Sequence, residues 1–283
     1  MTSLSYCAEQ VRLYDHDRFM TVIFAPAAVR EHLFALYAFN IELAKIREIV
    51  SEPLIGQMRL QWWRDTLDRL YGGGTVMHEV ARPLGAAIVA GGMPRAAFDP
   101  LIDAREFDLD GTPPAHLAAL LAYAEGTGAP VLGLALQIAG AVQKADPPGA
   151  AEVARLAGTD WALAGLLRAV PFHARQHRLY LPADMLEAAG VRTSRLFDLK
   201  PEAGLGDVIR AIAERARANF AAARKPVREL PRAGRSPALL IELGQLYLGD
   251  LERSGWDPIA LEKKPPRRFT AARLALAASL KGY

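Results

Sequence analysis

Apolar residues recur every three, four or seven positions over long stretches of this chain, and this is the spacing of one face of an α-helix. The longest such segment follows Pro26, a residue that favours the start of a helix. Its apolar positions are Val29, Leu33, Leu36, Leu43, Ile46 and Val50. The spacing therefore predicts a long helix over residues 29–50.

Three further segments show the same spacing: residues 55–70, which end before the glycines at 72–74, residues 208–220, and residues 239–247. Clusters of Pro and Gly separate these segments and mark turns. No stretch alternates polar and apolar residues between hairpin turns, as half-buried strands do. The pattern predicts an all-α fold of about ten to twelve helices. No linker demands a division, so we expect one domain over residues 1–283.

The most apolar stretch, residues 117–142, is interrupted by Glu125, Gly126, Gly128 and Pro130. A membrane-spanning helix needs about 20 predominantly apolar residues. We therefore expect two buried helices joined by a turn here, and any membrane contact to be peripheral. The N-terminus has no uninterrupted apolar segment of the kind found in a secretory signal.

The charge of the chain is nearly balanced, with 34 Lys and Arg against 31 Asp and Glu, a net charge of +3. A mildly basic protein can meet an anionic surface, but this balance does not indicate nucleic-acid binding. Cys7 is the only cysteine, so no internal disulfide can form. A reducing, cytoplasmic compartment is the simplest interpretation.

Two segments have the outline of a known pair of motifs. Residues 37–48 read YAFNIELAKIRE, and residues 167–182 read LRAVPFHARQHRLYLP. They resemble the two signatures of the squalene/phytoene synthase family, Y-A-F-C-R-x-x-D-D-x-x-D/E and L-R-D-x-x-x-D-x-x-x-x-R-x-Y-L-P. Two shorter landmarks, LQWWR at 60–64 and YAEGTG at 123–128, follow the order of the family. The resemblance implies an isoprenoid-synthase-like helical bundle around a central cavity.

The acids of both signatures are almost all missing. Active members of the family use them to hold Mg²⁺ against the diphosphate that leaves. Apart from Glu48, the signature acids and the preceding Gln and Asn are replaced, by Ala44, Lys45, Ala162, Gly165, Ala169 and His173. An imidazole is a poor Mg²⁺ ligand. We therefore expect no catalytic residue, metal site or cofactor. The alternative is a prenyltransferase that joins two prenyl diphosphates head to head, with Glu48 helping to hold Mg²⁺.

A narrower resemblance involves four segments: residues 39–44, 50–53, 55–63 and 167–173. They are similar to a branch of the family that keeps the fold without the aspartate motifs and includes a mitochondrial assembly factor of respiratory complex I. The resemblance implies a non-catalytic protein that acts in the assembly of this NADH:ubiquinone oxidoreductase. Its partners would be complex I subunits or assembly intermediates. It would work at the inner-membrane surface, on the matrix side if the protein is organellar.

Bases stand where the family has acids, which suggests an anion site without a metal. Arg can bind phosphate through two parallel hydrogen bonds. The family geometry would bring the two signature helices together around an isoprenoid or anionic lipid. The candidate residues are Lys45, Arg47, Glu48, Arg64, Arg168, His173, Arg175, Arg178 and Tyr180. The other interpretation is a solvated basic helix end whose cations pair with nearby acids.

Two charged segments remain. Residues 103–110 contain four acids and could bind a divalent ion or a partner, or form an exposed helix end with Phe107 and Leu109 packed inward. Residues 263–268 read KKPPRR and precede an amphipathic helix predicted over residues 269–280. Such a run can hold a protein at an anionic membrane, or it can be an exposed connector.

Overall fold

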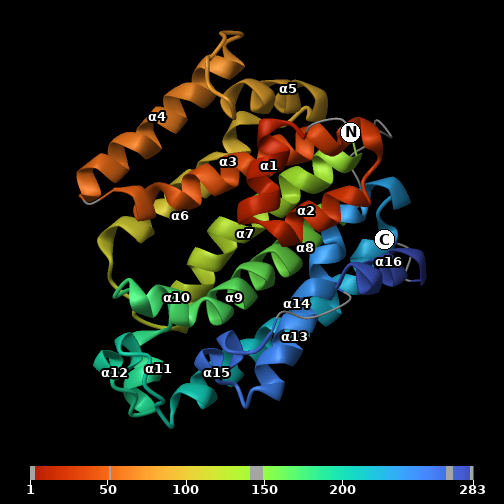
Figure 1. The fold of residues 1–283 in the computed structure, drawn as a ribbon. Helices are drawn as coiled ribbons and strands as arrows, with labels where there is room; N and C mark the ends of the chain where they lie inside the picture. The colour runs from red at the N-terminus through yellow and green to blue at the C-terminus, as the bar shows by residue number, and fades with distance from the viewer. Residues whose placement is uncertain (1–3, 51, 141–148, 266–269, 281–282) are drawn as a thin grey trace.

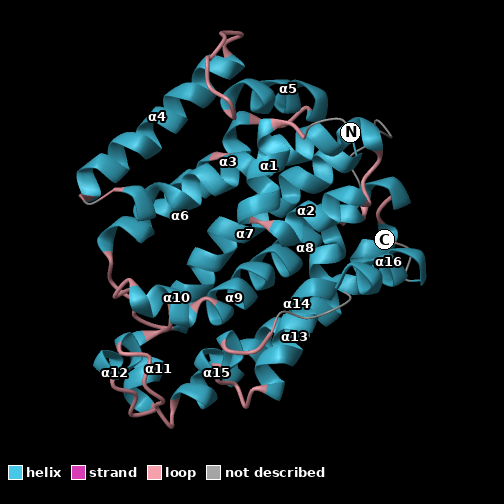
Figure 2. Ribbon diagram, viewed as in Figure 1, coloured by secondary structure: helices cyan, strands magenta, loops and turns pink. Residues whose placement is uncertain are grey.

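Helices joined by loops make up the part of the chain that the structure describes, and that part contains no strand (Figure 2). The computed structural model describes residues 4–50, 52–140, 149–265, 270–280 and 283. The all-α prediction is confirmed. The α-helices of the described residues are α1 (Tyr6–Tyr14), α2 (His16–Ile23), α3 (Arg30–Ile49), α4 (Pro53–Tyr71), α5 (Ala81–Gly91), α6 (Asp99–Asp110), α7 (Leu117–Gly140), α8 (Ala150–Val153), α9 (Thr159–Arg168), α10 (Val170–Arg175), α11 (Ala183–Ala188), α12 (Thr193–Phe197), α13 (Leu205–Glu229), α14 (Leu240–Arg253), α15 (Pro258–Glu262) and α16 (Thr270–Leu280).

The described residues contain more α-helices than the ten to twelve that the sequence predicts, and short helices account for the difference. Helices α8, α10, α11, α12 and α15 have between four and six residues each. Segments shorter than two turns show no periodicity, so hydrophobic spacing does not reveal them. The long helices predicted from spacing, including α3, α4, α13 and α14, are confirmed.

The corner between α3 and α4 follows from Pro53. Glu52 is extended, with φ −113° and ψ 135°, because a proline ring disfavours the helical conformation of the residue before it. Pro53 then occupies the first turn of α4, where its missing N–H has no intrahelical partner to lose. The chain therefore reverses, and α4 packs along α6 and α3 (Figure 1).

The expectation of two helices between residues 117 and 142 was wrong. Residues Leu117–Gly140 form the single helix α7, with Pro130 inside it; residues 141–142 lie outside the described residues. The glycines serve a helix contact and not a turn, since a Cβ on Gly128 would lie 2.1 Å from the carbonyl oxygen of Gly158. An internal proline costs about 3 kcal/mol in a helix. The burial of α7 in the core offsets this cost.

Helix α7 runs through the middle of the fold (Figure 1), in contact with α3 and α6 and with α9 and the π-helical turn Ala154–Gly158 (η4). Among the described residues it is the one helix long and apolar enough to cross a membrane. A helix that is apolar nearly all round is also what the centre of a large core requires. The packing around α7 explains its composition.

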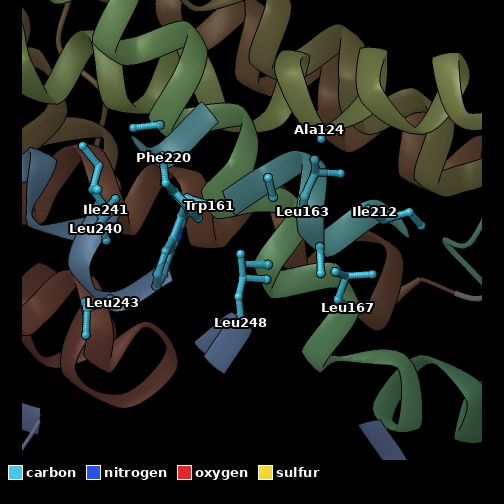
Figure 3. Close-up of a cluster of buried hydrophobic side chains, with 14 of the residues drawn as sticks. Ala124, Trp161, Leu163, Leu167, Ile212, Phe220, Leu240, Ile241, Leu243 and Leu248 are labelled. Carbon is cyan, nitrogen blue, oxygen red and sulfur yellow. The ribbon is translucent and has the colours of Figure 1, made fainter. Parts of the chain in front are cut away.

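Two clusters of buried apolar side chains meet along α7. Leu132 and Leu136 belong to the cluster shared with α9, α13 and α14, whereas Val131 and Leu134 belong to the cluster shared with α1, α3 and α5. Figure 3 shows part of the first cluster, in which Trp161 lies among side chains from other helices. Tight packing of this kind fixes α9 and α14 relative to each other.

Candidate functional site

A cavity of about 1400 Å³ lies between α2, α9, α14, α15 and α16. Helix α9 contributes Gly165 and Arg168, and Ala169 follows directly after its end, at the start of the second sequence motif. Met20 and Leu261 add apolar surface to the same wall. The cavity therefore combines several charged groups with a smaller apolar surface, a combination suited to a ligand with a polar head and an apolar body.

Asp17, Arg168 and Tyr247 form a polar centre in the cavity wall. The Tyr247 hydroxyl donates a hydrogen bond to Asp17 Oδ1. Arg168 Nη1 lies 3.6 Å from Asp17 Oδ2, and the guanidinium carbon lies 3.5 Å from the centre of the Tyr247 ring. Burial raises the pKa of Asp17, while Tyr247 and Arg168 oppose this rise. The three groups thus link α2, α9 and α14 and hold the guanidinium over the face of the Tyr247 ring.

Ion pairs surround the polar centre. Arg253 Nη2 lies 2.5 Å from Asp250 Oδ1. Arg175 binds Glu262 through both of its terminal nitrogens, at 2.7 and 2.5 Å. Lys264 Nζ lies 3.3 Å from the carbonyl oxygen of Arg253. The rim is therefore rich in cations, although most of them already have an anionic or carbonyl partner.

A second polar cluster lies around the buried carboxylate of Asp108, at the end of α6. The hydroxyls of Tyr123 and Tyr180 donate to its Oδ1 at 2.8 and 2.6 Å. Arg105 Nη1 lies 3.2 Å from its Oδ2, and Arg178 donates to its backbone carbonyl oxygen at 3.1 Å. These bonds tie the loop of the second motif to α6.

His173 borders this cluster. Its ring centre lies 4.6 Å from that of Tyr180, and its Nδ1 is shielded from solvent without a hydrogen-bond partner. Burial lowers the pKa of His173 to about 4; the charge of Arg178 acts in the same direction, against that of Asp108. The imidazole is therefore neutral at physiological pH.

The comparison with known families concerns nearly the whole chain. The family model for squalene/phytoene synthase matches residues 11–274, a range that includes the cavity and the Asp108 cluster. The chain belongs to the squalene/phytoene synthase family.

The NADH dehydrogenase (ubiquinone) complex I assembly factor 6 of Bos taurus is 31% identical over 226 residues, 80% of this chain and 67% of the relative. The presqualene diphosphate synthase of Rhodopseudomonas palustris is 26% identical over 253 residues, 89% of this chain and 88% of the relative. The crystal structure of a dehydrosqualene synthase in complex with ligand superposes with a TM-score of 0.81 at 18% identity, over 98% of this chain and 96% of that one. The isoprenoid-synthase fold is therefore confirmed.

Within this family fold, the candidate residues from the sequence lie in several places. Arg178, Tyr180 and His173 come together at Asp108, and Arg168 lines the cavity. Arg175 reaches the rim through Glu262.

The candidates on α3 and α4 lie away from the cavity wall. Lys45 Nζ lies 2.8 Å from the centre of the Tyr14 ring. Arg47 donates to the carbonyl oxygen of Val50 at 3.1 Å, and Glu48 is exposed. Arg64 pairs with the acids of α6, Asp103 and Glu106, at 2.7 Å each.

Sequence reasoning missed Asp108, as it missed Asp17 and Tyr247 of the cavity. The sequence predicts for residues 103–110 a divalent-ion site, a partner contact or an exposed acidic helix end. Leu109 is buried as expected and Phe107 is half-buried, but Asp108 is buried too, at 5% exposure. Asp108 lies seven positions after the buried Leu101, on the same helix face, and this spacing was the available signal.

The residues at the family's Mg²⁺ positions do not fit the metal. Ala169 contributes no ligand oxygen to the cavity, and Lys45 contributes a cation that lies on an aromatic ring. Throughout the described ranges, no group of three His, Cys, Asp or Glu side chains could hold a metal ion. Mg²⁺ takes oxygen ligands, chiefly carboxylates, water and phosphates. The signature positions therefore supply no set of ligands for metal-assisted loss of diphosphate.

Proposed function

We propose that this member of the family acts in the assembly of respiratory complex I and binds an isoprenoid or anionic lipid in the cavity. The observation that carries the proposal is the start of the second motif, where Arg168 lines the cavity and Ala169 stands in place of the first acid. The likeness to the assembly factor 6 proteins of Bos taurus and Homo sapiens supports the assembly role. Partners would be complex I subunits or assembly intermediates at the inner-membrane surface, on the cytoplasmic or matrix side.

The assembly role is tested by deleting the gene and measuring NADH:quinone oxidoreductase activity in isolated membranes. We expect a loss of activity and of assembled complex I, both restored by the wild-type gene. Succinate:quinone activity serves as the control, since it does not pass through complex I. Unchanged NADH:quinone activity in the deletion strain would refute the assembly role.

Lipid binding is supported by the mixed lining of the cavity, with Arg168 beside Met20 and Leu261. The probe is farnesyl diphosphate, titrated calorimetrically into the protein in EDTA, so that a bound metal makes no contribution. Arg168→Ala should weaken binding by about tenfold or more, because a charge-assisted contact to phosphate is lost. Arg210→Ala is the matched control, since Arg210 pairs with Asp207 on the exposed face of α13. Absence of binding by the wild type would contradict this part of the proposal.

A second function is a Mg²⁺-dependent prenyltransferase, which the likeness to a presqualene diphosphate synthase favours. The test is diphosphate release from farnesyl and geranylgeranyl diphosphate, with and without Mg²⁺. Metal-dependent release that is lost in Glu48→Ala, but kept in the exposed control Glu9→Ala, would establish this function. No release beside an active family member would leave the non-catalytic proposal standing.

A further inference from the structure

Helix α16 covers one side of the cavity and is held by few side chains. Leu274 and Ala277 are buried against the short helix Ser236–Leu239 (η6) and α14. Thr270, Ala271 and Arg273 line the cavity. Figure 1 shows α16 at the surface of the molecule, near the C-terminus. The helix thus borders the cavity at its N-terminal end, while most of its other residues are exposed.

A line of exposed residues along α16 is apolar except for Arg273, which lies at the edge of the cavity. Leu276 and Leu280 are 58% and 76% exposed, and Arg273 is exposed as well. The three residues are spaced i, i+3 and i+7, so they lie on one line along the helix. Arg273, Leu276 and Leu280 are called the docking face below.

The sequence around the docking face is unusually basic. Between Glu262 and Tyr283 it contains six Lys or Arg residues and no Asp or Glu. Of the predicted basic run, Lys263 and Lys264 are exposed, and residues 266–269, which include the predicted start of the last helix, lie outside the described residues. A segment that joins exposed leucines to cations, and has no acid in its own sequence, is complementary to anionic lipid headgroups above acyl chains.

The exposed stripe on α4 provides a contrast. Leu54, Met58 and Trp62 are also exposed, at spacing i, i+4 and i+8. Two exposed acids, Glu48 and Glu52, lie just before this stripe in sequence. An anionic bilayer would repel these two acids, and the exposed Arg59 on α4 balances only one of them. The α16 segment, in contrast, has cations and no acid of its own.

We propose that the docking face of α16 binds the surface of an anionic lipid bilayer and so brings the mouth of the cavity to the membrane. This proposal depends on the proposed function in one respect only, namely that a lipid enters the cavity. A bilayer fits better than an acidic protein surface, because the docking face has no aromatic side chain and its apolar part consists of only two leucines. Protein interfaces are anchored by Trp, Tyr and Arg in fitted pockets.

The test is flotation of the full-length protein with vesicles of phosphatidylcholine, alone or mixed with phosphatidylglycerol. We expect wild-type protein to bind the mixed vesicles at least about tenfold more tightly, with an affinity that falls as salt rises. Leu276→Gln combined with Leu280→Gln should weaken binding by about tenfold. The matched control is Leu54→Gln combined with Met58→Gln, which changes two equally exposed side chains on α4 and should bind like wild type.

A charge variant completes the design. Lys263→Glu should weaken binding to the mixed vesicles, whereas Lys225→Glu, on the exposed side of α13, should not. Equal binding to neutral and anionic vesicles, or an equal loss in the α4 and α16 variants, would overturn the proposal. No binding by wild type would overturn it too and leave an acidic protein as the occupant. Failure of the proposed function can be told apart from failure of this proposal. Arg168→Ala should still bind vesicles, and this expectation does not depend on the complex I activity of the deletion strain.

Discussion

Asp108 and Tyr180 are 72 residues apart in sequence, yet the Tyr180 hydroxyl lies 2.6 Å from Asp108 Oδ1. This bond joins the end of α6 to the R-x-Y-L-P part of the second motif. Arg178, the other polar residue of that segment, donates to the same Tyr180 oxygen and to the backbone of Asp108. The surviving part of the motif therefore has a structural role that needs no metal or substrate.

Removing the Asp108 carboxylate should destabilise the fold severely. Asp108→Ala leaves the half-buried Arg105 and two tyrosine hydroxyls without their acceptor, so we expect the free energy of unfolding to fall by about 3 kcal/mol. Urea denaturation monitored by circular dichroism measures the change. Asp103→Ala is the control, since it removes an exposed ion pair and should change stability by less than about 1 kcal/mol. Equal effects of the two variants would contradict the role of the cluster.

His173 should make the fold sensitive to acid. Its pKa is lowered to about 4, below the ordinary 6.5, so the unfolded chain binds the proton more readily. The contribution of neutral His173 to the free energy of unfolding is therefore fully present above about pH 6.5. It is lost as the pH falls towards 4, by on the order of 3 kcal/mol. His173→Gln should reduce this loss, while His116→Gln, at an exposed position, should keep the wild-type slope. Denaturant midpoints between pH 4 and 7 give the comparison, and parallel slopes in both variants would refute it.

Asp160 should have the opposite effect on the pH dependence of stability, lowering stability as the pH rises. This carboxyl group is fully buried in α9; Asn219 lies 3.4 Å from its Oδ1, and its Oδ2 has no partner. Burial raises its pKa to about 7, so the folded state holds the proton more tightly than the unfolded state. Its ionisation therefore destabilises the fold increasingly as the pH rises from about 4 to about 7.

Asp160→Asn removes this ionisation while keeping the shape of the side chain. We expect the variant to be more stable than wild type at pH 8 and nearly equal to it at pH 4. Thermal melting at the two pH values measures the difference. A variant that is less stable than wild type at pH 8 would show that the carboxylate is satisfied in the fold.

The contact between α7 and η4 should not tolerate a methyl group at residue 128. A Cβ there would lie 2.1 Å from the backbone oxygen of Gly158, which moves only with its helix, so Gly128→Ala should cost about 3 kcal/mol or more. Gly133→Ala, on the same helix, is the control. Its Cβ would meet Ala154 at an ordinary 3.5 Å, and alanine favours a helix by about 1 kcal/mol over glycine. Chemical denaturation should thus give changes of opposite sign.

Periodicity predicted the long helices well, because each of them buries one face and exposes another. It failed for α7, whose glycines and Pro130 look like a turn until the approach of Gly158 is known. The burial of Asp108 was missed because its partners come from α7 and from the second motif, far away in sequence. The motifs could not reveal the partners of Lys45 and Arg168 either, which are Tyr14 and Asp17 on the first two helices. Fold class follows from local spacing, but pairing of charges requires the tertiary arrangement.

The position of α7 between the two apolar clusters has a consequence for how the chain unfolds. Neighbouring residues of α7, such as Val131 and Leu132, belong to different clusters. Unfolding of either cluster therefore exposes one side of α7, and the other cluster packs against the same helix. The two halves should therefore lose structure in one cooperative step, and damage on one side should be felt as lost protection against hydrogen exchange on the other.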